Sequence, residues 1–417
     1  MTRSPENFPL RRTAFGAAVL LGASVLGLLG APAGSALAEP APPPAGHALA
    51  GLSADELARF ERGRSAFERT RNIATGLGPV FNDVACNRCH NRRGVGGAGI
   101  QSATQIGRMQ GDTFDALVGS GGPSLSANTV LVEPAPDVQR LIPGCRLPRD
   151  AEPLPATANV VVRRRTTPLF GLGLVDATPD ATFEALARRQ PESIRGRVAR
   201  VQNRATGGVS AGKFGWKAQA PTLHQFSGLA LLMELGVTSP EYAVEDAPSG
   251  DQAAVSACDA LADPEDDGAD VAGMTDFMRL LAPVAALSSD APEVRAGDAL
   301  FTRAGCDSCH VRALRSGPSP IAALSEQAYA PYSDFLLHDM GALGDGVVEG
   351  DAGPREMRTA PLWGTRLGLG RFLHDGRARS LSDAILAHDG QGAEARSAFT
   401  QLDVTQRRAL IAFLETL

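Results

Sequence analysis

The sequence predicts a mainly α-helical fold of two related domains, the first enlarged by a large, partly irregular insertion. The pattern C-x-x-C-H occurs twice, at residues 86–90 and 306–310, and helical patterns lie on both sides of each copy. A length of 417 residues is enough for two domains with their own cores. We therefore place the first domain at residues 53–284 and the second at residues 285–417.

A shared helical motif precedes each copy of C-x-x-C-H. Gly63 and Phe67 have the same G-x-x-x-F spacing as Gly297 and Phe301. A glycine in a helix allows the backbone of another helix to come close. The first of these helices is expected to begin at the capping box Ser53–Glu56. The repeat therefore extends beyond the cysteine motifs.

A second amphipathic helix is expected to close each domain by packing across its first helix. Apolar residues recur there at the i, i+3, i+4, i+7 spacing of one helix face. They are Met274, Phe277, Met278 and Leu281 in the first domain and Leu410, Phe413, Leu414 and Leu417 in the second. The insertion contains a β-like run at Val160–Arg165 and a helical stretch at Asp180–Arg189.

The C-x-x-C-H pattern is the attachment signature of c-type haem. Its two thiols add across the haem vinyl groups, and the histidine that follows becomes the proximal ligand of the iron. A redox dithiol or a zinc site is the alternative, but neither needs a histidine directly after each second cysteine. The sequence thus predicts two covalently bound haems in two cytochrome c-like domains. The residues expected to hold them are Cys86, Cys89, His90, Cys306, Cys309 and His310.

The N-terminus has the pattern of an export signal. Arg11 and Arg12 precede an uncharged apolar run, and Ala36–Ala38 forms a small-residue cleavage site. We expect residues 1–38 to be a signal peptide, residues 39–52 a flexible tether, and the protein to be periplasmic. The alternative is an uncut membrane anchor, because the apolar run is nearly long enough to span a bilayer. The Pro-rich start of the tether favours cleavage.

Charge and the remaining cysteines restrict the partners. The formal net charge is −6, and the three Arg and one Glu of residues 1–38 contribute +2, so the rest of the chain carries about −8. This acidity argues against a nucleic-acid partner and suits a small basic redox protein as electron donor or acceptor, although many soluble proteins are simply acidic.

Cys145 and Cys258 lie outside the haem motifs, and an oxidising compartment would allow a disulfide between them.

Six further segments carry motifs of one known family. They are Gly76–Asn82, Pro168–Leu174, Phe214–Ala218, Asp334–Gly341, Thr359–Gly364 and Phe372–Ala378. With them the chain resembles, from about Ala54 to Leu417, the bacterial di-haem oxidoreductase family and, more distantly, the di-haem cytochrome c peroxidases. Members of the family are labelled peroxidases or thiol oxidoreductases. The resemblance implies an exported di-haem oxidoreductase with an active crevice between its domains, and peroxide or another small oxidant as its substrate.

The resemblance also implies a second ligand for the C-terminal haem. In the peroxidase relatives an H-D-G turn leads into a helix whose far end supplies a methionine to that haem. Here the turn is His374–Gly376, and His388 stands in the place of the methionine. We expect His388 to be the distal ligand, with Met340 as its rival. A His/His haem has a lower potential than a His/Met haem, so this haem departs from the high-potential haem of those peroxidases.

The first haem has no second histidine in its own stretch of chain. None occurs between His90 and His224, and Met109 is a nearby residue able to ligate iron. An open or water-bound sixth position is our main hypothesis, with His224 ranked below it as a ligand or distal base. A carboxylate above such an iron helps to break the O–O bond of peroxide. The candidates are Asp176 and Glu234, for which a helix-surface position is the alternative.

Other interpretations stay open at this point. A non-catalytic electron-transfer cytochrome, with both irons six-coordinate, is the alternative function. Thiol-directed chemistry rests on the family label alone, since both C-x-x-C motifs serve haem. Trp216 and Trp363 are candidate electron relays or core residues. His338 and His374 have structural or propionate-facing places in their motifs.

Two charged segments are candidate binding sites. Arg108 and the cluster Arg163–Arg165 have the chemistry of haem-propionate partners. The segment Asp263–Gly268 resembles the first half of a calcium loop, but Met274 stands where the loop would need its final Glu. Calcium is therefore a secondary cofactor hypothesis, and a solvated linker is the preferred interpretation.

Overall fold

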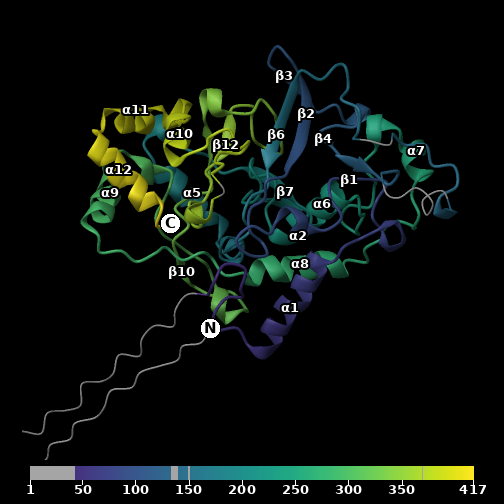
Figure 1. Cartoon of the computed structure of the whole chain (residues 1–417), viewed down its shortest axis with the longest axis horizontal. Coiled ribbons are helices and arrows are strands. Elements are labelled where there is room, and N and C mark those ends of the chain that lie inside the picture. Colours follow the sequence, from purple (N-terminus) through teal and green to yellow (C-terminus); the bar gives the residue numbers. More distant parts are fainter. Residues whose placement is uncertain (1–42, 133–139, 149–150, 369) are drawn as a thin grey trace, which may run out of the picture. The chain divides into compact units, whose positions relative to one another are not determined.

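The structure is a computed structural model that describes residues 43–132, 140–148, 151–368 and 370–417 (Figure 1). The chain is 36% helical and 15% strand, so helix predominates as predicted. The predicted signal peptide, residues 1–38, lies outside the described residues. Within the described ranges, no helix combines the length and the apolar character needed to cross a membrane.

Helices and strands occur in runs along the chain, such as α6 to α9 and β9 to β12. The α-helices are α1 (Ala54–Glu68), α2 (Cys86–Cys89), α4 (Leu172–Asp176), α5 (Asp180–Arg189), α6 (Leu223–Leu235), α7 (Gln252–Ser256), α8 (Ala269–Leu280), α9 (Pro292–Arg303), α10 (Leu381–Leu386), α11 (Ala393–Gln401) and α12 (Val404–Leu414). The strands are β1 (Val80–Phe81), β2 (Ser102–Gln110), β3 (Thr113–Asp115), β4 (Ser124–Leu125), β5 (Asn128–Thr129), β6 (Val160–Arg165), β7 (Arg200–Asn203), β8 (Gly208–Ala211), β9 (Leu314–Arg315), β10 (Ala328–Tyr329), β11 (Leu337–Asp339) and β12 (Glu356–Arg358).

Two helix pairs repeat the same crossing, α8 on α1 and α12 on α9 (Figure 1). An added Cβ at Gly63 would lie 2.2 Å from the carbonyl oxygen of Gly273, and one at Gly297 would lie 2.0 Å from that of Ala409. Only glycine therefore permits either crossing. These contacts confirm that each closing helix packs across the first helix of its own half.

A phenylalanine four residues after each of these glycines stacks on the partner helix. The ring centroids of Phe67 and Phe277 are 4.8 Å apart, and those of Phe301 and Phe413 are 5.5 Å apart. All four rings are buried. Such offset or edge-on aromatic pairs add to the apolar area that they bury, which explains why the G-x-x-x-F motif occurs at both places.

The two hydrophobic cores differ in extent. The smaller core is built mainly by α9, α11 and α12. The larger core starts at α1 and α8 and also includes Phe335 and Trp363 from the C-terminal half. Packing therefore crosses the predicted domain boundary at residues 284–285, and the division into two haem domains stays a prediction.

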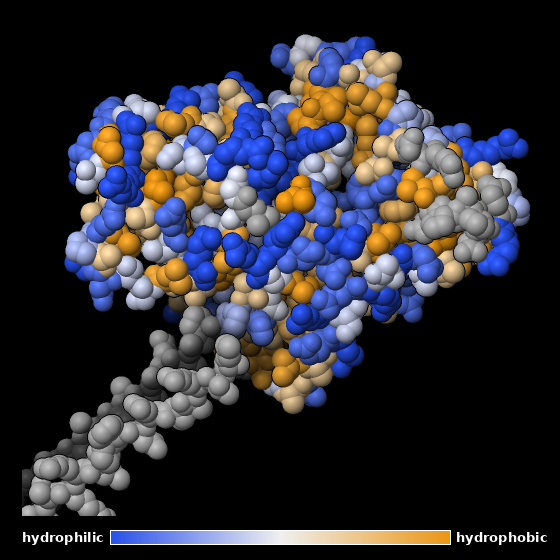
Figure 2. Space-filling view, viewed as in Figure 1, coloured by the Kyte–Doolittle hydropathy of each residue, from blue (hydrophilic) through white to orange (hydrophobic). Residues whose placement is uncertain are grey.

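The insertion contains a four-stranded antiparallel sheet. β6 forms over the predicted residues and pairs with β2 from Ser102 opposite Arg165 to Gly107 opposite Val160. β3 and β4 also pair with β2. The sequence did not indicate β2, because its residues mix polar side chains with a glycine and lack a simple alternation. Figure 2 shows apolar residues gathered over this sheet on a face that is otherwise mostly hydrophilic.

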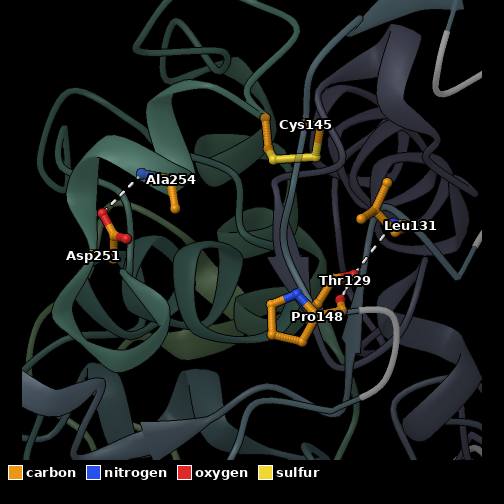
Figure 3. Close-up of a disulfide and its surroundings, with 7 residues drawn as sticks. Thr129, Leu131, Cys145, Pro148, Asp251 and Ala254 are labelled. Atoms are coloured by element: carbon orange, nitrogen blue, oxygen red, sulfur yellow. Dashed lines mark hydrogen bonds between the residues drawn. A yellow bond between two sulfur atoms is a disulfide. The ribbon is translucent and has the colours of Figure 1, made fainter.

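A disulfide joins Cys145 to Cys258 across 113 residues of the insertion (Figure 3). Both cysteines are buried. Close to them, the Thr129 hydroxyl donates a hydrogen bond to the carbonyl oxygen of Pro148 at 2.6 Å, and Asp251 caps α7. The structure thus pairs the two cysteines that the haem motifs leave over.

Candidate haem sites

Two histidine rings face each other in the C-terminal half. His310 ends the second C-x-x-C-H motif, His388 lies two residues after α10, and their ring centroids are 6.4 Å apart. The Nδ1 atom of His310 bonds the carbonyl oxygen of Tyr332 at 2.9 Å, and that of His388 bonds the carbonyl oxygen of Ala384 at 2.9 Å. These bonds fix the tautomer and leave each Nε2 atom for a metal.

The spacing of these rings suits an iron ion bound between them. With metal–nitrogen bonds of about 2 Å, a metal held by two imidazoles keeps the ring centroids roughly 6 Å apart. Burial lowers the pKa of His310 to about 4, with a smaller contribution from His388, and burial also lowers the pKa of His388. Both rings are therefore neutral at pH 7, which is the form that ligates iron.

Met340, the rival ligand, lies beside His388. An added Cβ at Gly392 would lie 3.1 Å from the His388 ring and 3.1 Å from the terminal methyl group of Met340. The ring that contacts His310 is that of His388, and Met340 lies next to it.

His338 lies on the attachment side of the same motif and is buried. Its Nε2 bonds the Asp334 carboxylate at 2.9 Å, and its Nδ1 lies 3.8 Å from the Cys309 sulfur. Burial opposes the charged ring, but the contacts with Asp334 and Cys309 outweigh it and raise the pKa of His338 to about 10. Both ring nitrogens of His338 are thus engaged within the chain.

His90, the proximal histidine of the first motif, has surroundings like those of His310. The Nδ1 atom of His90 bonds the carbonyl oxygen of Thr167 at 3.0 Å, and burial lowers the pKa of His90 to about 4. The aromatic ring next to it is Phe67, with centroids 6.0 Å apart. As at His310, Nε2 is left for a metal.

The four cysteines of the two motifs are free thiols. Burial raises the pKa of Cys86, Cys89 and Cys306 to about 12 each. A thiol attacks disulfides or binds zinc as the thiolate, and reactive cysteines have lowered pKa values. These environments therefore argue against reactive thiolates at the two motifs.

Glu234, one of the two predicted catalytic carboxylates, lies on α6 near the first motif. Its carboxylate accepts a hydrogen bond from the Asn82 side chain at 2.9 Å, and burial raises its pKa. Burial is the main cause of the raised thiol pKa values of Cys86 and Cys89, and the charge of Glu234 raises them further. A carboxyl group whose pKa is raised in this way can hold a proton near neutral pH.

Asp176, the other predicted carboxylate, ends α4 and joins three helices. It forms an ion pair with Arg279 of α8 at 3.1 Å and accepts a hydrogen bond from the Leu223 N–H at the start of α6, at 3.0 Å. Its oxygens are thus committed to the chain. Of the two candidates, Glu234 has the surroundings expected of a proton donor.

His224 and Met109 were the candidate ligands for the first iron. The His224 side chain is 40% exposed, and its Nε2 lies 3.4 Å from Glu241. Met109 pairs with Phe114 in the β2–β3 hairpin. In the part of the chain that the structure describes, neither residue hydrogen-bonds to His90 or stacks on it.

His374 and Trp216 connect the C-terminal half to the first site. Their rings meet edge to face, 6.2 Å apart. The Trp216 indole donates to the Arg165 carbonyl oxygen at 3.1 Å, and the Arg165 N–H donates to the His374 carbonyl oxygen at 2.7 Å. Two residues beyond Arg165 is Thr167, the partner of His90. His374 is buried, and its Nε2 has no hydrogen-bond partner.

Arg164, a predicted propionate partner, is instead bound to carboxylates of the chain. It donates to Asp345 at 2.8 Å and also pairs with Glu349. Lys217, which is fully buried, reaches the same Asp345 at 3.1 Å. The sequence did not reveal this buried ion network, because its members lie far apart in the chain. Trp363, the other predicted relay, is buried against Tyr329.

Comparison with known proteins places the chain in a family. The sequence model described as "Di-haem oxidoreductase, putative peroxidase" matches residues 156–417, so the protein belongs to this family of di-haem oxidoreductases, as the motifs predicted. The matched range includes the second haem motif, and the first motif at residues 86–90 precedes it. No curated protein matches the chain.

Two solved structures are similar to the chain at low identity. Hydrazine synthase of Kuenenia stuttgartiensis, pressurised with xenon, shares 13% identity over 96% of this chain and 100% of its own, with a TM-score of 0.41. A MauG-like protein associated with microbial copper homeostasis shares 14% identity over 90% of this chain and 92% of its own, with a TM-score of 0.38. At these values the likeness contributes nothing to the functional assignment.

Proposed function

We propose that the protein is an exported di-haem c-type cytochrome oxidoreductase that reduces peroxide at its N-terminal haem. Membership of the family supports a di-haem redox role. The single observation that carries the finer proposal is the difference between the two iron sites. The His388 ring lies near His310, whereas no histidine ring contacts His90 among the residues that the structure describes.

The second site is proposed to store electrons. When bound, haem supplies an iron that changes oxidation state, and a six-coordinate iron has no position for a substrate. His310 and His388 would hold this iron, while Cys306 and Cys309 attach the porphyrin. The carbonyl partners of both histidines keep the rings from turning.

The first site is proposed to perform the chemistry. Reduction of hydrogen peroxide to two molecules of water takes two electrons and two protons. Glu234 is the proposed proton source, since burial raises its pKa and the Asn82 side chain fixes one of its oxygens. His90 and the pair Cys86 and Cys89 would hold the haem.

Electrons are proposed to reach the first site through the contact of Trp216 and His374. The Trp216 side chain and the His374 backbone carbonyl both bond to the backbone of Arg165, which is close in sequence to the partner of His90. The external donor would be a small redox protein. The expected charge of about −8 on the exported chain favours a basic one.

The second candidate function is a non-catalytic electron-transfer cytochrome, and one observation favours it. The Nε2 atom of His374 is buried without a hydrogen-bond partner, so a polar atom there lacks the bond that burial normally requires. If His374 ligated the first iron, both irons would be six-coordinate and neither would bind peroxide.

Electron paramagnetic resonance with and without cyanide separates the two functions. The fully oxidised and half-reduced holoproteins are both measured. In the fully oxidised protein we expect a high-spin signal that cyanide converts to low-spin, beside a low-spin signal that cyanide leaves unchanged. In the half-reduced protein one iron is ferrous and silent, so the cyanide-sensitive signal should remain alone. Low-spin signals that ignore cyanide in both states would overturn the peroxidase proposal. In that case His374→Ala should produce a high-spin signal, which would identify the carrier.

A further inference from the structure

Three carboxylates converge in the segment between α6 and α8, outside both haem sites. One oxygen each from Glu245, Asp263 and Glu265 lies within 4.8 Å of the others. Thr238, three residues after α6, joins the group. Its hydroxyl is 2.6 Å from an Asp263 oxygen and also contacts Glu265. This group is called the Glu245 cluster below.

Glu245 is the unusual member of the cluster. It is 7% exposed, and both of its carboxylate oxygens are buried without a hydrogen-bond partner. One oxygen of Glu265 is buried and unpartnered as well. A carboxylate removed from water needs hydrogen bonds or an opposite charge, because burial otherwise disfavours it strongly. Glu245 and one oxygen of Glu265 therefore lack a partner.

The charges around Glu245 are of one sign. Burial, followed by the neighbouring carboxylates, raises the pKa of Glu245 to about 9. The carboxylates that act on it are Glu265, Asp263, Asp259 and Asp246. Arg71 passes near Glu265 at Gly76, but its guanidinium pairs with Asp270 and donates to the Thr75 carbonyl oxygen. Several carboxylates that can only accept hydrogen bonds thus lie around Glu245, and the nearby Arg71 is already bound to other groups.

The Thr238 hydroxyl cannot satisfy the cluster either. A hydroxyl has a single proton to donate, yet this one contacts carboxylate oxygens of both Asp263 and Glu265. When both carboxylates are ionised, one of the two contacts therefore has no hydrogen between its oxygens. A cation that binds several oxygen ligands would be a partner for the oxygens of this contact and for the unpartnered oxygens of Glu245.

We propose that the Glu245 cluster binds a calcium ion. Calcium takes six to eight oxygen ligands at about 2.3–2.6 Å, so ligands on opposite sides lie about 5 Å apart, in agreement with the observed convergence. Asp263–Gly268 has the sequence of the first half of a calcium loop. The carboxylate that such a loop would place at Met274 comes instead from Glu245, upstream.

The proposed ion would support the first haem site from a distance. Thr238 follows α6, the helix that carries Glu234. On the other side, Glu265 packs against Gly76, where an added Cβ would lie 3.1 Å from the Glu265 side chain, in the segment that leads to the first haem motif. Calcium would hold these two segments together, which is a positioning role and stands apart from the proposed peroxide chemistry.

Calcium binding to the intact holoprotein tests the proposal. Protein treated with a chelator is titrated with calcium by calorimetry, and its Tm is measured with and without excess calcium. We expect wild type to bind calcium and to gain several degrees in Tm, since a ligand that binds the folded state stabilises it. Glu245→Gln should bind at least about tenfold more weakly, given that losing even a partner of a ligand weakens metal binding about 10- to 100-fold.

Asp112→Asn is the matched control, since it removes one negative charge from an exposed turn. It should bind calcium like wild type. Absence of calcium binding to wild type, or unchanged affinity and stoichiometry in Glu245→Gln, would overturn the proposal. If Glu245→Gln does not fold, hydrogen exchange of wild type decides. Amides of residues 236–268 should exchange more slowly with calcium, and unchanged exchange there would refute the site.

Discussion

In the second haem-binding region His388 faces His310 at a ring separation of 6.4 Å, whereas in the first region the ring beside His90 is Phe67, at 6.0 Å. Both proximal histidines bond a backbone carbonyl through Nδ1. The same attachment motif therefore has two different surroundings. In the proposed function, the residues that reach each motif from elsewhere in the chain distinguish the site that stores electrons from the site that reduces peroxide.

The two regions also differ in how they are held together. The first is built on a sheet, a disulfide and a large core that includes C-terminal residues. The second depends on a small core around α9 and α12. The large core contains residues of both halves, so the following variants test whether the effect of a substitution stays within its own region.

The largest effect is expected from His388→Met. Methionine favours reduced iron more than imidazole does, so the potential of the second haem should rise by a substantial part of the ~0.8 V range that axial ligands span. Potentiometric titration and the absorption spectrum measure this change, and the first haem should keep its potential. Met340→Leu is the control and should leave both haems unchanged. Identical spectra for wild type and His388→Met would show that His388 is not the ligand.

Glu234→Gln should act on the first region alone. Loss of a positioned proton donor should slow peroxide reduction by about 10²- to 10⁴-fold, with both haem spectra unchanged. Because the protonated carboxyl is the active form, the wild-type rate should fall as the pH rises through its raised pKa, and the variant should lack this fall. Asp176→Asn is the matched control, which should lose stability through its Arg279 pair and retain most of the rate. Equal rates for wild type and Glu234→Gln would remove Glu234 from the mechanism.

Cys145→Ser should destabilise the first region by about 2–5 kcal/mol, as removal of a native disulfide does. In chemical denaturation, the signal of the first haem should be lost at lower denaturant concentration than that of the second. The double variant with Cys258→Ser should show the same loss as the single one, because both remove one bond. Simultaneous loss of the two haem signals would mean that the regions unfold together.

Gly297→Ala should have the smallest effect, about 1–3 kcal/mol, because it forces a methyl group against the Ala409 carbonyl oxygen. The loss should be confined to the second region, and Gly63→Ala should produce the corresponding loss in the first. Thermal unfolding followed by circular dichroism measures both. Gly119→Ala is the control, since an added Cβ there meets nothing within 4 Å. If Gly297→Ala were as stable as wild type, the close helix crossing would be wrong.

Local sequence patterns predicted several helices and strands correctly. The capping box of Ser53, the strand Val160–Arg165 and the helix Asp180–Arg189 form where the sequence indicated them, because each depends on neighbouring residues. The two glycine crossings followed from a motif that is repeated in the chain. Helix pairing was therefore predictable without knowledge of the tertiary structure.

Contacts between distant segments were not predictable. The strand β2 has no clear alternation and is defined by its partner β6. The approach of His374 to Trp216 and the burial of Lys217 with Asp345 each require the folded chain. The identity of His388 as a candidate came from a family motif, and its distance to His310 came only from the structure. Chemistry at the irons depends mainly on contacts of this second kind.

The carbonyl partners of the proximal histidines have a consequence for assembly of the protein. His310 meets Tyr332 only 22 residues further along the chain, whereas His90 meets Thr167 after 77, and Thr167 follows a strand that is itself tied to His374. During synthesis from the N-terminus, the first motif emerges long before the residues that complete its surroundings. The first motif therefore waits longer for its carbonyl partner than the second motif does.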